Sequence, residues 1–132
     1  MSSGFFPLES LKALISHHIA ILERYEVGSE QEFSIIYFEF GLYKDDIELK
    51  RTIQTVFRDC DIIFEYEKDN IILLPKANWQ YSFELLKELK EFLNQTVEDS
   101  IVTYPDDGKD ANALLKSLKT LVKKNHNKEL DF

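Results

Sequence analysis

Few residues of this sequence have the type and spacing for metal or nucleophilic chemistry. His17 and His18 are adjacent, and adjacent helical residues point in different directions, so the two imidazoles are poorly placed to share a metal ion. Because His18 falls on an apolar stripe, we interpret it as a hydrogen-bonded residue at the edge of the core. Cys60 is the single cysteine, so no internal disulfide and no cysteine ligand spacing exist. The sequence contains no Ser/His/Asp or Cys/His set, and its four glycines do not cluster into a phosphate-binding loop.

Arg58 and Asp61 form a charged pair in the sequence Arg-Asp-Cys-Asp. Arg58 ends a stretch with helical spacing, where the helix dipole favours a cation, and Asp61 is near enough for a local ion pair. From the residues alone, this structural role is the interpretation that we prefer.

Basic residues gather in the last predicted helix and the tail that follows it. A solvent-exposed face, with lysines favoured at the C-terminal end of the helix, is the preferred interpretation. A patch for an anionic partner is the alternative. The residues are Lys116, Lys119, Lys123, Lys124 and Lys128.

Hydrophobic periodicity predicts the elements that must position these side chains. Apolar residues three and four apart indicate helices, and runs of β-branched and aromatic residues indicate strands. The expected helices are 7–25, 45–57, 78–94 and a last helix that begins near Asp110. The expected strands are 33–40, 62–66, 71–74 and 100–104. The aromatic residues near the start of the third helix, Trp79, Tyr81 and Phe83, are expected mostly in the core, and an interface position for one of them is the alternative.

The charged tetrad Glu67-Lys68-Asp69-Asn70 separates two apolar strands and predicts a hairpin turn. We expect the tetrad to be exposed, because long charged side chains are costly to bury without partners. After the first helix, the order of the elements is β-α-β-β-α-β-α. This split βαβ order predicts an α/β (α+β), ferredoxin-like fold, in which a mainly antiparallel sheet has its helices packed on one face.

Length and composition indicate one globular domain. The 132 residues are 44% hydrophobic, and the net charge of −8 argues against a nucleic-acid partner or an anionic membrane surface. No apolar run approaches the roughly 20 residues that a membrane helix needs, so we expect no membrane insertion by this chain alone. The single cysteine fits a reducing cytoplasm, which is the expected location.

Two segments carry motifs in a recognisable order. Residues 101–124, IVTYPDDGKDANALLKSLKTLVKK, read as a strand, a Tyr-Pro-acid-Gly turn and a helix with a Leu-Leu pair. Residues 58–75, RDCDIIFEYEKDNIILLP, read as an RxxD, a hairpin and an apolar strand closed by proline. Together they resemble the GGDEF family of cyclic di-GMP signalling proteins. The resemblance covers nearly the whole chain, with Ser3-Gly4 at the position of the family's Leu-Thr-Gly entry.

The resemblance implies a nucleotidyl-cyclase palm, in which a βαββαβ core is joined by N- and C-terminal helices, over a single domain from 1 to 132. In active cyclases of the family, the hairpin turn reads Gly-Gly-Asp/Glu-Glu-Phe, and its acids support metal binding and catalysis. Here Glu67 and Lys68 replace the glycines. Asp69 can be placed at the acidic position, but Asn70 cannot act as a carboxylate.

A second departure from the family follows the first strand. The family has an Asp-x-Asp-like metal site there, and then a stretch that reads guanine. In this sequence Glu39-Phe40-Gly41 takes the metal position, and Lys44-Asp45-Asp46 leads almost directly into the next helix. Phosphoryl transfer relies on positioning and metal charge, so we expect no metal site, no cofactor and no cyclase activity.

The RxxD is the family motif that this sequence retains. It stands five residues before the hairpin, where it forms a secondary cyclic di-GMP site in the family, and the resemblance gives Arg58 and Asp61 that role. A guanidinium can pair with guanine O6 and N7 or with phosphate. On this basis we expect Arg58→Ala to abolish ligand binding and to leave the melting temperature nearly unchanged.

The expected function is therefore a catalytically inactive GGDEF-like signalling domain, with a protein partner or a second copy as its target and cyclic di-GMP as its ligand. One alternative is residual GTP binding or cyclase activity through Glu39 and Asp69. Another is a purely structural dimerisation module.

Overall fold

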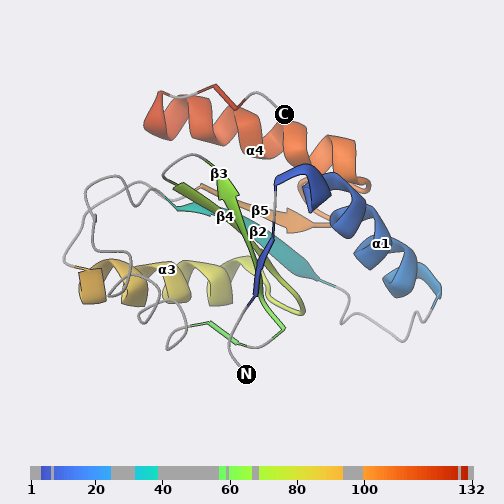
Figure 1. The fold of residues 1–132 in the computed structure, drawn as a ribbon, viewed down its shortest axis with the longest axis horizontal. Coiled ribbons are helices and arrows are strands. Elements are labelled where there is room, and N and C mark those ends of the chain that lie inside the picture. The colour runs from blue at the N-terminus through green and yellow to red at the C-terminus, as the bar shows by residue number, and fades with distance from the viewer. Residues whose placement is uncertain are drawn as a thin grey trace.

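The protein is represented by a computed structural model. It describes residues 4–6, 8–24, 32–38, 57–58, 60–66, 69–93, 100–127 and 129–130. The described chain forms one five-stranded sheet with the strand order β1-β3-β4-β2-β5 (Figure 1). The strands are β1 (Gly4–Phe6), β2 (Phe33–Phe38), β3 (Ile62–Tyr66), β4 (Asp69–Leu74) and β5 (Ser100–Tyr104). The β3/β4, β4/β2 and β2/β5 pairs are antiparallel, which confirms the predicted mainly antiparallel sheet.

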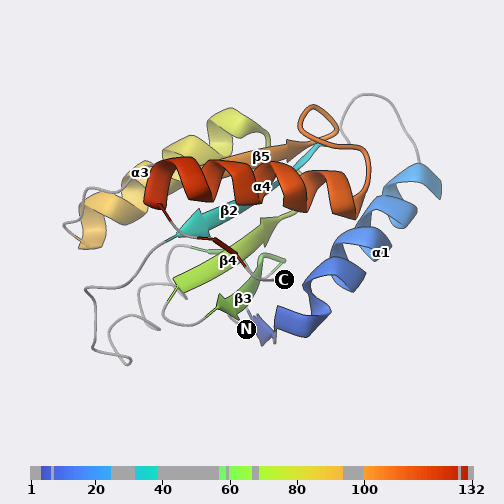
Figure 2. The same ribbon diagram turned by 90° about the horizontal axis from the view of Figure 1, so that it is seen from above.

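Helices cover both faces of the sheet, so the prediction that they pack on one face is wrong. α1 (Leu11–Arg24), which follows a short 3-10 turn at Leu8–Ser10, lies with α4 (Ala111–His126) over one face (Figures 1 and 2). α3 (Trp79–Leu93) covers the other face (Figure 1). Two separate apolar clusters result, one on each face of the sheet. Both faces of the sheet therefore exclude water, as a three-layer domain requires.

Strand β2 is the interior strand that the sequence predicts. All six of its residues are buried, because β4 and β5 flank it and helices cover both its faces. Its alternate side chains separate accordingly: Ile35 packs in the α1/α4 cluster and Ile36 packs in the α3 cluster. This two-sided burial is the reason that the strand has no polar face in the sequence.

Strand β1 was not predicted. Gly4–Phe6 pairs in parallel with Ile62, Ile63 and Phe64 at the edge of the sheet. Three residues are too few to display the period of two by which a strand is detected in a sequence. The expected helix over 7–25 is correspondingly shorter, since the α-helix begins at Leu11.

The hairpin is present, but its turn is tighter than predicted. Tyr66 pairs with Asp69 and Glu65 pairs with Asn70, so only residues 67–68 remain between the two strands. Glu67 and Lys68 lie outside the described residues. Asn70 is 6% exposed and also pairs with Phe38 of β2, which contradicts the prediction of an exposed turn position. Asn70 is therefore part of strand β4, since its backbone pairs with both β3 and β2.

Part of the predicted fold lies outside the described residues. The expected second helix, 45–57, and the connection from β2 to β3 fall almost entirely within 39–56. For the third expected helix, 78–94, the structure describes the backbone as far as Leu93. Residues 94–99 lie outside the described residues. Among the helices described, none is both long and apolar enough to cross a lipid bilayer.

The turn after β5 connects the sheet directly to α4. Asp107 accepts a hydrogen bond from the Thr103 amide at 2.8 Å, and Ser117 of α4 donates to the Asp107 carbonyl at 2.8 Å. Asp110 then caps α4 by accepting from the Ala113 amide at 2.8 Å, as the prediction of a helix beginning near Asp110 requires. Gly108 packs against this first turn: a Cβ atom there would lie 2.7 Å from the backbone nitrogen of Leu114. The turn therefore requires glycine at position 108, because a Cβ atom there would collide with the backbone of α4.

Candidate functional site

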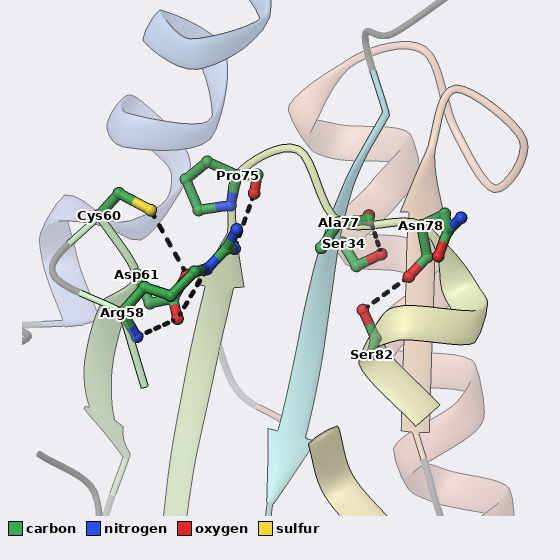
Figure 3. Close-up of polar contacts among 8 residues, drawn as sticks. All are labelled: Ser34, Arg58, Cys60, Asp61, Pro75, Ala77, Asn78 and Ser82. Carbon is green, nitrogen blue, oxygen red and sulfur yellow. Dashed lines mark hydrogen bonds and ion pairs between the residues drawn. The ribbon is translucent and has the colours of Figure 1, made fainter. Parts of the chain in front are cut away.

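Arg58 and Asp61 form a closely bonded ion pair at the start of β3 (Figure 3). The Nη2 and Nε atoms of Arg58 donate to Oδ1 of Asp61 at 2.8 and 3.1 Å. The backbone amide of Arg58 donates to Oδ2 at 2.8 Å, and the Asp61 amide donates back to the Arg58 carbonyl at 3.0 Å. Side-chain and backbone bonds close the same short loop, which fixes the orientation of the carboxylate.

The Arg58 side chain also reaches two residues distant in the sequence. Its Nη2 atom donates to the carbonyl of Pro75 at 2.8 Å, just after β4 ends (Figure 3). Its guanidinium carbon lies 5.0 Å from the centroid of the Tyr81 ring in α3. A guanidinium over an aromatic face is attracted by the ring quadrupole. Arg58 therefore connects the loop before β3, the end of β4 and the start of α3.

The electrostatics keep Arg58 charged. Burial alone disfavours the cation, but the hydrogen bonds and the charge of Asp61 outweigh that effect and raise the pKa of Arg58 above its usual value. The Asp61 side chain is 0% exposed, whereas the Arg58 side chain is 36% exposed. Of the two RxxD residues, Arg58 is thus the one that presents charge to the solvent.

A second polar contact lies beside the first, on the same connection between β4 and α3. Ser34 of β2 donates to the Ala77 carbonyl at 2.7 Å (Figure 3). Its hydroxyl is also 3.1 Å from that of Thr103 in β5. Asn78 begins α3, where its side chain accepts from the Tyr81 amide at 2.8 Å. Lys76, between the two anchored carbonyls, has a left-handed backbone with a φ of 54°. Several bonds therefore fix the segment that leads into α3.

The structure separates the other predicted site residues from Arg58. Arg58 contacts Pro75, at one end of β4, and Asn70 is near the other end, roughly 16 Å away at about 3.3 Å per strand residue. Glu39 lies outside the described residues, as do Glu67 and Lys68. In the ranges that the structure describes, no group of three or more His, Cys, Asp or Glu side chains is arranged to hold a metal ion.

Two of the three aromatic residues at the start of α3 lie on the surface, in contrast to the prediction that they are mostly in the core, whereas Phe83 packs against the core cluster as predicted. Trp79 is 48% exposed and Tyr81 is 39% exposed, while Phe83 is half-buried. The Trp79 and Phe83 rings stack with centroids 5.0 Å apart. The buried stripe of the helix instead runs through Leu85, Leu86 and Leu89. The i to i+4 spacing of Trp79 and Phe83 fits a core stripe equally well, so the sequence could not show that the stripe starts one turn later.

His18 differs from the predicted hydrogen-bonded residue. Its ring packs edge-on against Phe33 with centroids 4.8 Å apart, and its buried Nε2 atom has no hydrogen-bond partner among the residues that the structure describes. Burial lowers the pKa of His18 below its usual value, and the neighbouring His17 lowers it further. The imidazole therefore stays neutral in the folded state near neutral pH.

This environment predicts an acid-sensitive contribution to stability. The folded pKa is below the unfolded value of about 6.5, so the unfolded chain binds the proton first as the pH falls. The stability that the neutral His18 ring contributes should be complete above about pH 6.5 and should decline as the pH falls from there towards the folded pKa. Urea unfolding between pH 7.5 and 5.5 should show a smaller decline for His18→Leu than for wild type. His17→Gln, which alters the exposed neighbour, is the control and should retain most of the wild-type decline; equal slopes in all three proteins would contradict this assignment.

Comparison with known proteins finds similarity among solved structures. No protein-family model matches the chain, and no curated protein matches it. Among solved structures, the crystal structure of a sensory box/GGDEF family protein from Caulobacter crescentus CB15 superposes with a TM-score of 0.69 at 17% sequence identity. The match covers 95% of this chain and 95% of that one. The likeness extends over the sheet and the helices on both its faces, and the chain accordingly has a GGDEF-like fold.

Proposed function

We propose that the chain is a catalytically inactive GGDEF-like signalling domain that works through protein contacts and takes cyclic di-GMP as a regulatory ligand at Arg58. The observation that supports inactivity is the position of Asn70. It stands where the resemblance places a signature acid, yet it is an amide, 6% exposed, with its backbone paired to both Glu65 and Phe38. A neutral, enclosed side chain offers little to a divalent metal or a triphosphate.

Protein contact is supported by the exposed aromatic residues of α3. Trp79 and Phe83 stack on one another, and Trp79 presents nearly half of its surface to solvent. Aromatic residues are enriched at protein interfaces because a large, rigid ring gains much buried area for little lost entropy. This surface is the part of α3 that a partner or a second copy would cover.

The proposed ligand role divides the RxxD between two tasks. Arg58 is half-exposed and permanently charged, so it is the residue that can pair with guanine O6 and N7 or with phosphate. Asp61 is fully buried and bonded to Arg58, so its task is to orient the guanidinium. One such pair contributes about 1–3 kcal/mol of discrimination, so tight binding needs a dimeric ligand or a second protomer.

Two assays on the purified chain test this proposal. Incubation with GTP and Mg²⁺ or Mn²⁺ should yield no cyclic di-GMP by chromatography, under conditions in which an active diguanylate cyclase converts its substrate. Product formation would overturn the inactive assignment in favour of the enzyme alternative.

Calorimetric titration with cyclic di-GMP should give saturable heat for wild type and at least about a tenfold weaker affinity for Arg58→Lys. Lysine keeps the charge beside Asp61 but lacks the planar fork that pairs with guanine. The exposed Lys76→Ala variant, which changes a charge near the site without touching Arg58, is the control. Absence of heat at high micromolar ligand, or equal binding by Arg58→Lys, would leave the structural dimerisation module as the remaining function.

A further inference from the structure

The hydrogen bonds of Arg58 involve one edge of its guanidinium more than the other. Nε and Nη2 donate to Asp61 at 3.1 and 2.8 Å, and Nη2 also donates to the Pro75 carbonyl at 2.8 Å. A guanidinium has five N–H hydrogens, one on Nε and two on each Nη atom. Asp61 therefore occupies the Nε/Nη2 edge. A second planar partner would pair at the Nη1/Nη2 edge, in exchange for the bond to Pro75.

The ring of Tyr81 gives the guanidinium a third point of contact. The guanidinium carbon lies 5.0 Å from the centroid of this ring, a distance at which the negative face of the ring attracts a cation. Two hydrogen-bond partners, Asp61 and Pro75, define a line about which a planar group can still tilt. A contact with a third segment removes that freedom, so Tyr81 is the residue that can set the tilt of the guanidinium.

Tyr81 is itself held in place by the start of α3. Its backbone amide donates to the Asn78 side chain at 2.8 Å, and the next amide, that of Ser82, donates to the Asn78 carbonyl at 3.1 Å. Tyr81 also lies one helical turn before Leu85, which is buried in the α3 cluster. Nevertheless, Tyr81 is 39% exposed. A ring that served the core alone would be buried, whereas this ring is fixed at its backbone and supports a charged side chain at the surface.

We propose that Tyr81 is a positioning residue of the ligand site, whose ring orients the Nη1/Nη2 edge of Arg58 towards a guanine base. This inference rests on the proposed binding of cyclic di-GMP at Arg58, and it adds the residue on which selectivity for guanine depends. Guanine presents two neighbouring acceptors, O6 and N7, whereas adenine presents N7 beside an amino donor. A guanidinium that is correctly oriented can distinguish the two bases, and a tilted one loses the second hydrogen bond. Holding the arginine in advance also reduces the conformational entropy lost on binding.

Calorimetric titration with cyclic di-GMP and with cyclic di-AMP tests this selectivity. Tyr81→Phe keeps the aromatic face and should bind cyclic di-GMP within about twofold of wild type. Tyr81→Leu removes the ring and should bind it at least about fivefold more weakly. The preference of Tyr81→Leu for cyclic di-GMP over cyclic di-AMP should also fall at least about threefold. A role in stability alone would weaken both ligands equally and leave this preference unchanged.

Gln80→Leu is the matched control for the leucine variant. It introduces the same side chain at the exposed neighbouring position, where the wild-type residue bonds to Glu84 at 3.1 Å. Its affinity for cyclic di-GMP should stay within about twofold of wild type.

A measurement on the ligand-free chain separates this inference from the proposed function. In ¹H–¹⁵N spectra, the Nε–H signal of Arg58 is the arginine side-chain signal that Arg58→Lys removes. Because the ring current of an aromatic face shifts the signals of nearby protons, Tyr81→Leu should move this signal, and Tyr81→Phe should keep it near its wild-type position. If the wild-type chain binds no cyclic di-GMP, the proposed function fails, and this signal still decides whether Tyr81 positions Arg58.

Three results would overturn the proposal. These are an Arg58 Nε–H signal that is unchanged in Tyr81→Leu, a loss of affinity in Tyr81→Phe as large as that in Tyr81→Leu, and an unchanged preference for cyclic di-GMP in Tyr81→Leu. The second result would assign the effect to the tyrosine hydroxyl instead of the ring. Circular dichroism establishes that each variant is folded, and Tyr81→Met, which is also apolar and not aromatic, replaces Tyr81→Leu if that variant is not.

Discussion

Replacing Arg58 by alanine should lower the free energy of unfolding by about 2–3 kcal/mol. The substitution leaves the carboxylate of Asp61, 0% exposed, with backbone bonds but without its guanidinium, and it leaves the Pro75 carbonyl without its donor. Removing one partner of a buried pair costs more than the pair contributes, because the remaining charge stays desolvated. Urea unfolding followed by circular dichroism measures the change. The sequence does not reveal the contacts of Arg58 with Pro75 and Tyr81, and with these contacts in place we now expect a measurable loss of stability instead of a nearly unchanged melting temperature.

A double-mutant cycle separates the ion pair from the other contacts of Arg58. Asp61→Asn removes the buried charge, so Arg58→Ala should cost at least about 1 kcal/mol less in that background than in wild type. Additive losses in the cycle would mean that Arg58 stabilises the fold through Pro75 and Tyr81 alone. Because the single variant is destabilised, a loss of ligand binding in Arg58→Ala does not distinguish recognition from unfolding, and the lysine variant is the better test of the ligand.

Gly108→Ala should destabilise the protein by about 2–3 kcal/mol. The added Cβ would lie 2.7 Å from the Leu114 nitrogen and 2.9 Å from the Ala113 carbonyl carbon, both in the backbone of α4. Backbone atoms of a helix cannot rotate aside as a side chain can, so the whole first turn would have to move. The shift should also disturb the Asp110 cap on the Ala113 amide.

Thermal unfolding of Gly108→Ala beside Lys109→Ala measures this effect. Lys109 is the exposed neighbour in the same turn, and its replacement should alter stability by less than about 0.5 kcal/mol. A Gly108→Ala protein as stable as the control would show that the turn tolerates a side chain, and that the close approach to α4 is not a constraint on the sequence.

The sequence predicts most elements because their signals are local. β2, β5 and α4 are clear from composition, spacing and the Asp110 cap, and each occurs within one or two residues of its expected bounds where described. Layer assignment is not local: a helix with one apolar stripe fits either face of the sheet. β1 has three residues and is defined by its partner β3, which no pattern within Gly4–Phe6 can reveal.

The candidate sites show the same division between local and tertiary information. The pairing of Arg58 with Asp61 follows from a spacing of three residues, and it is the interpretation that the residues alone favoured. The contacts of Arg58 with Pro75 and Tyr81 depend on strand and helix placement. Likewise, Lys116 and Lys119 of the last helix line one groove with Lys12 of the first helix only in the folded chain.

The connection from β4 to α3 is held by hydrogen bonds at two points, on either side of a strained residue. Arg58 holds it at the Pro75 carbonyl and Ser34 holds it at the Ala77 carbonyl, with the left-handed Lys76 between them. A left-handed backbone at a non-glycine residue costs about 1 kcal/mol and persists where its flanks are fixed. A ligand that drew the guanidinium away from Pro75 would break the first of these hydrogen bonds and leave the second, from Ser34 to the Ala77 carbonyl, in place. The first turn of α3, which carries the exposed Trp79, follows this connection directly, so the loss of the bond to Pro75 would act on the residues next to the aromatic surface.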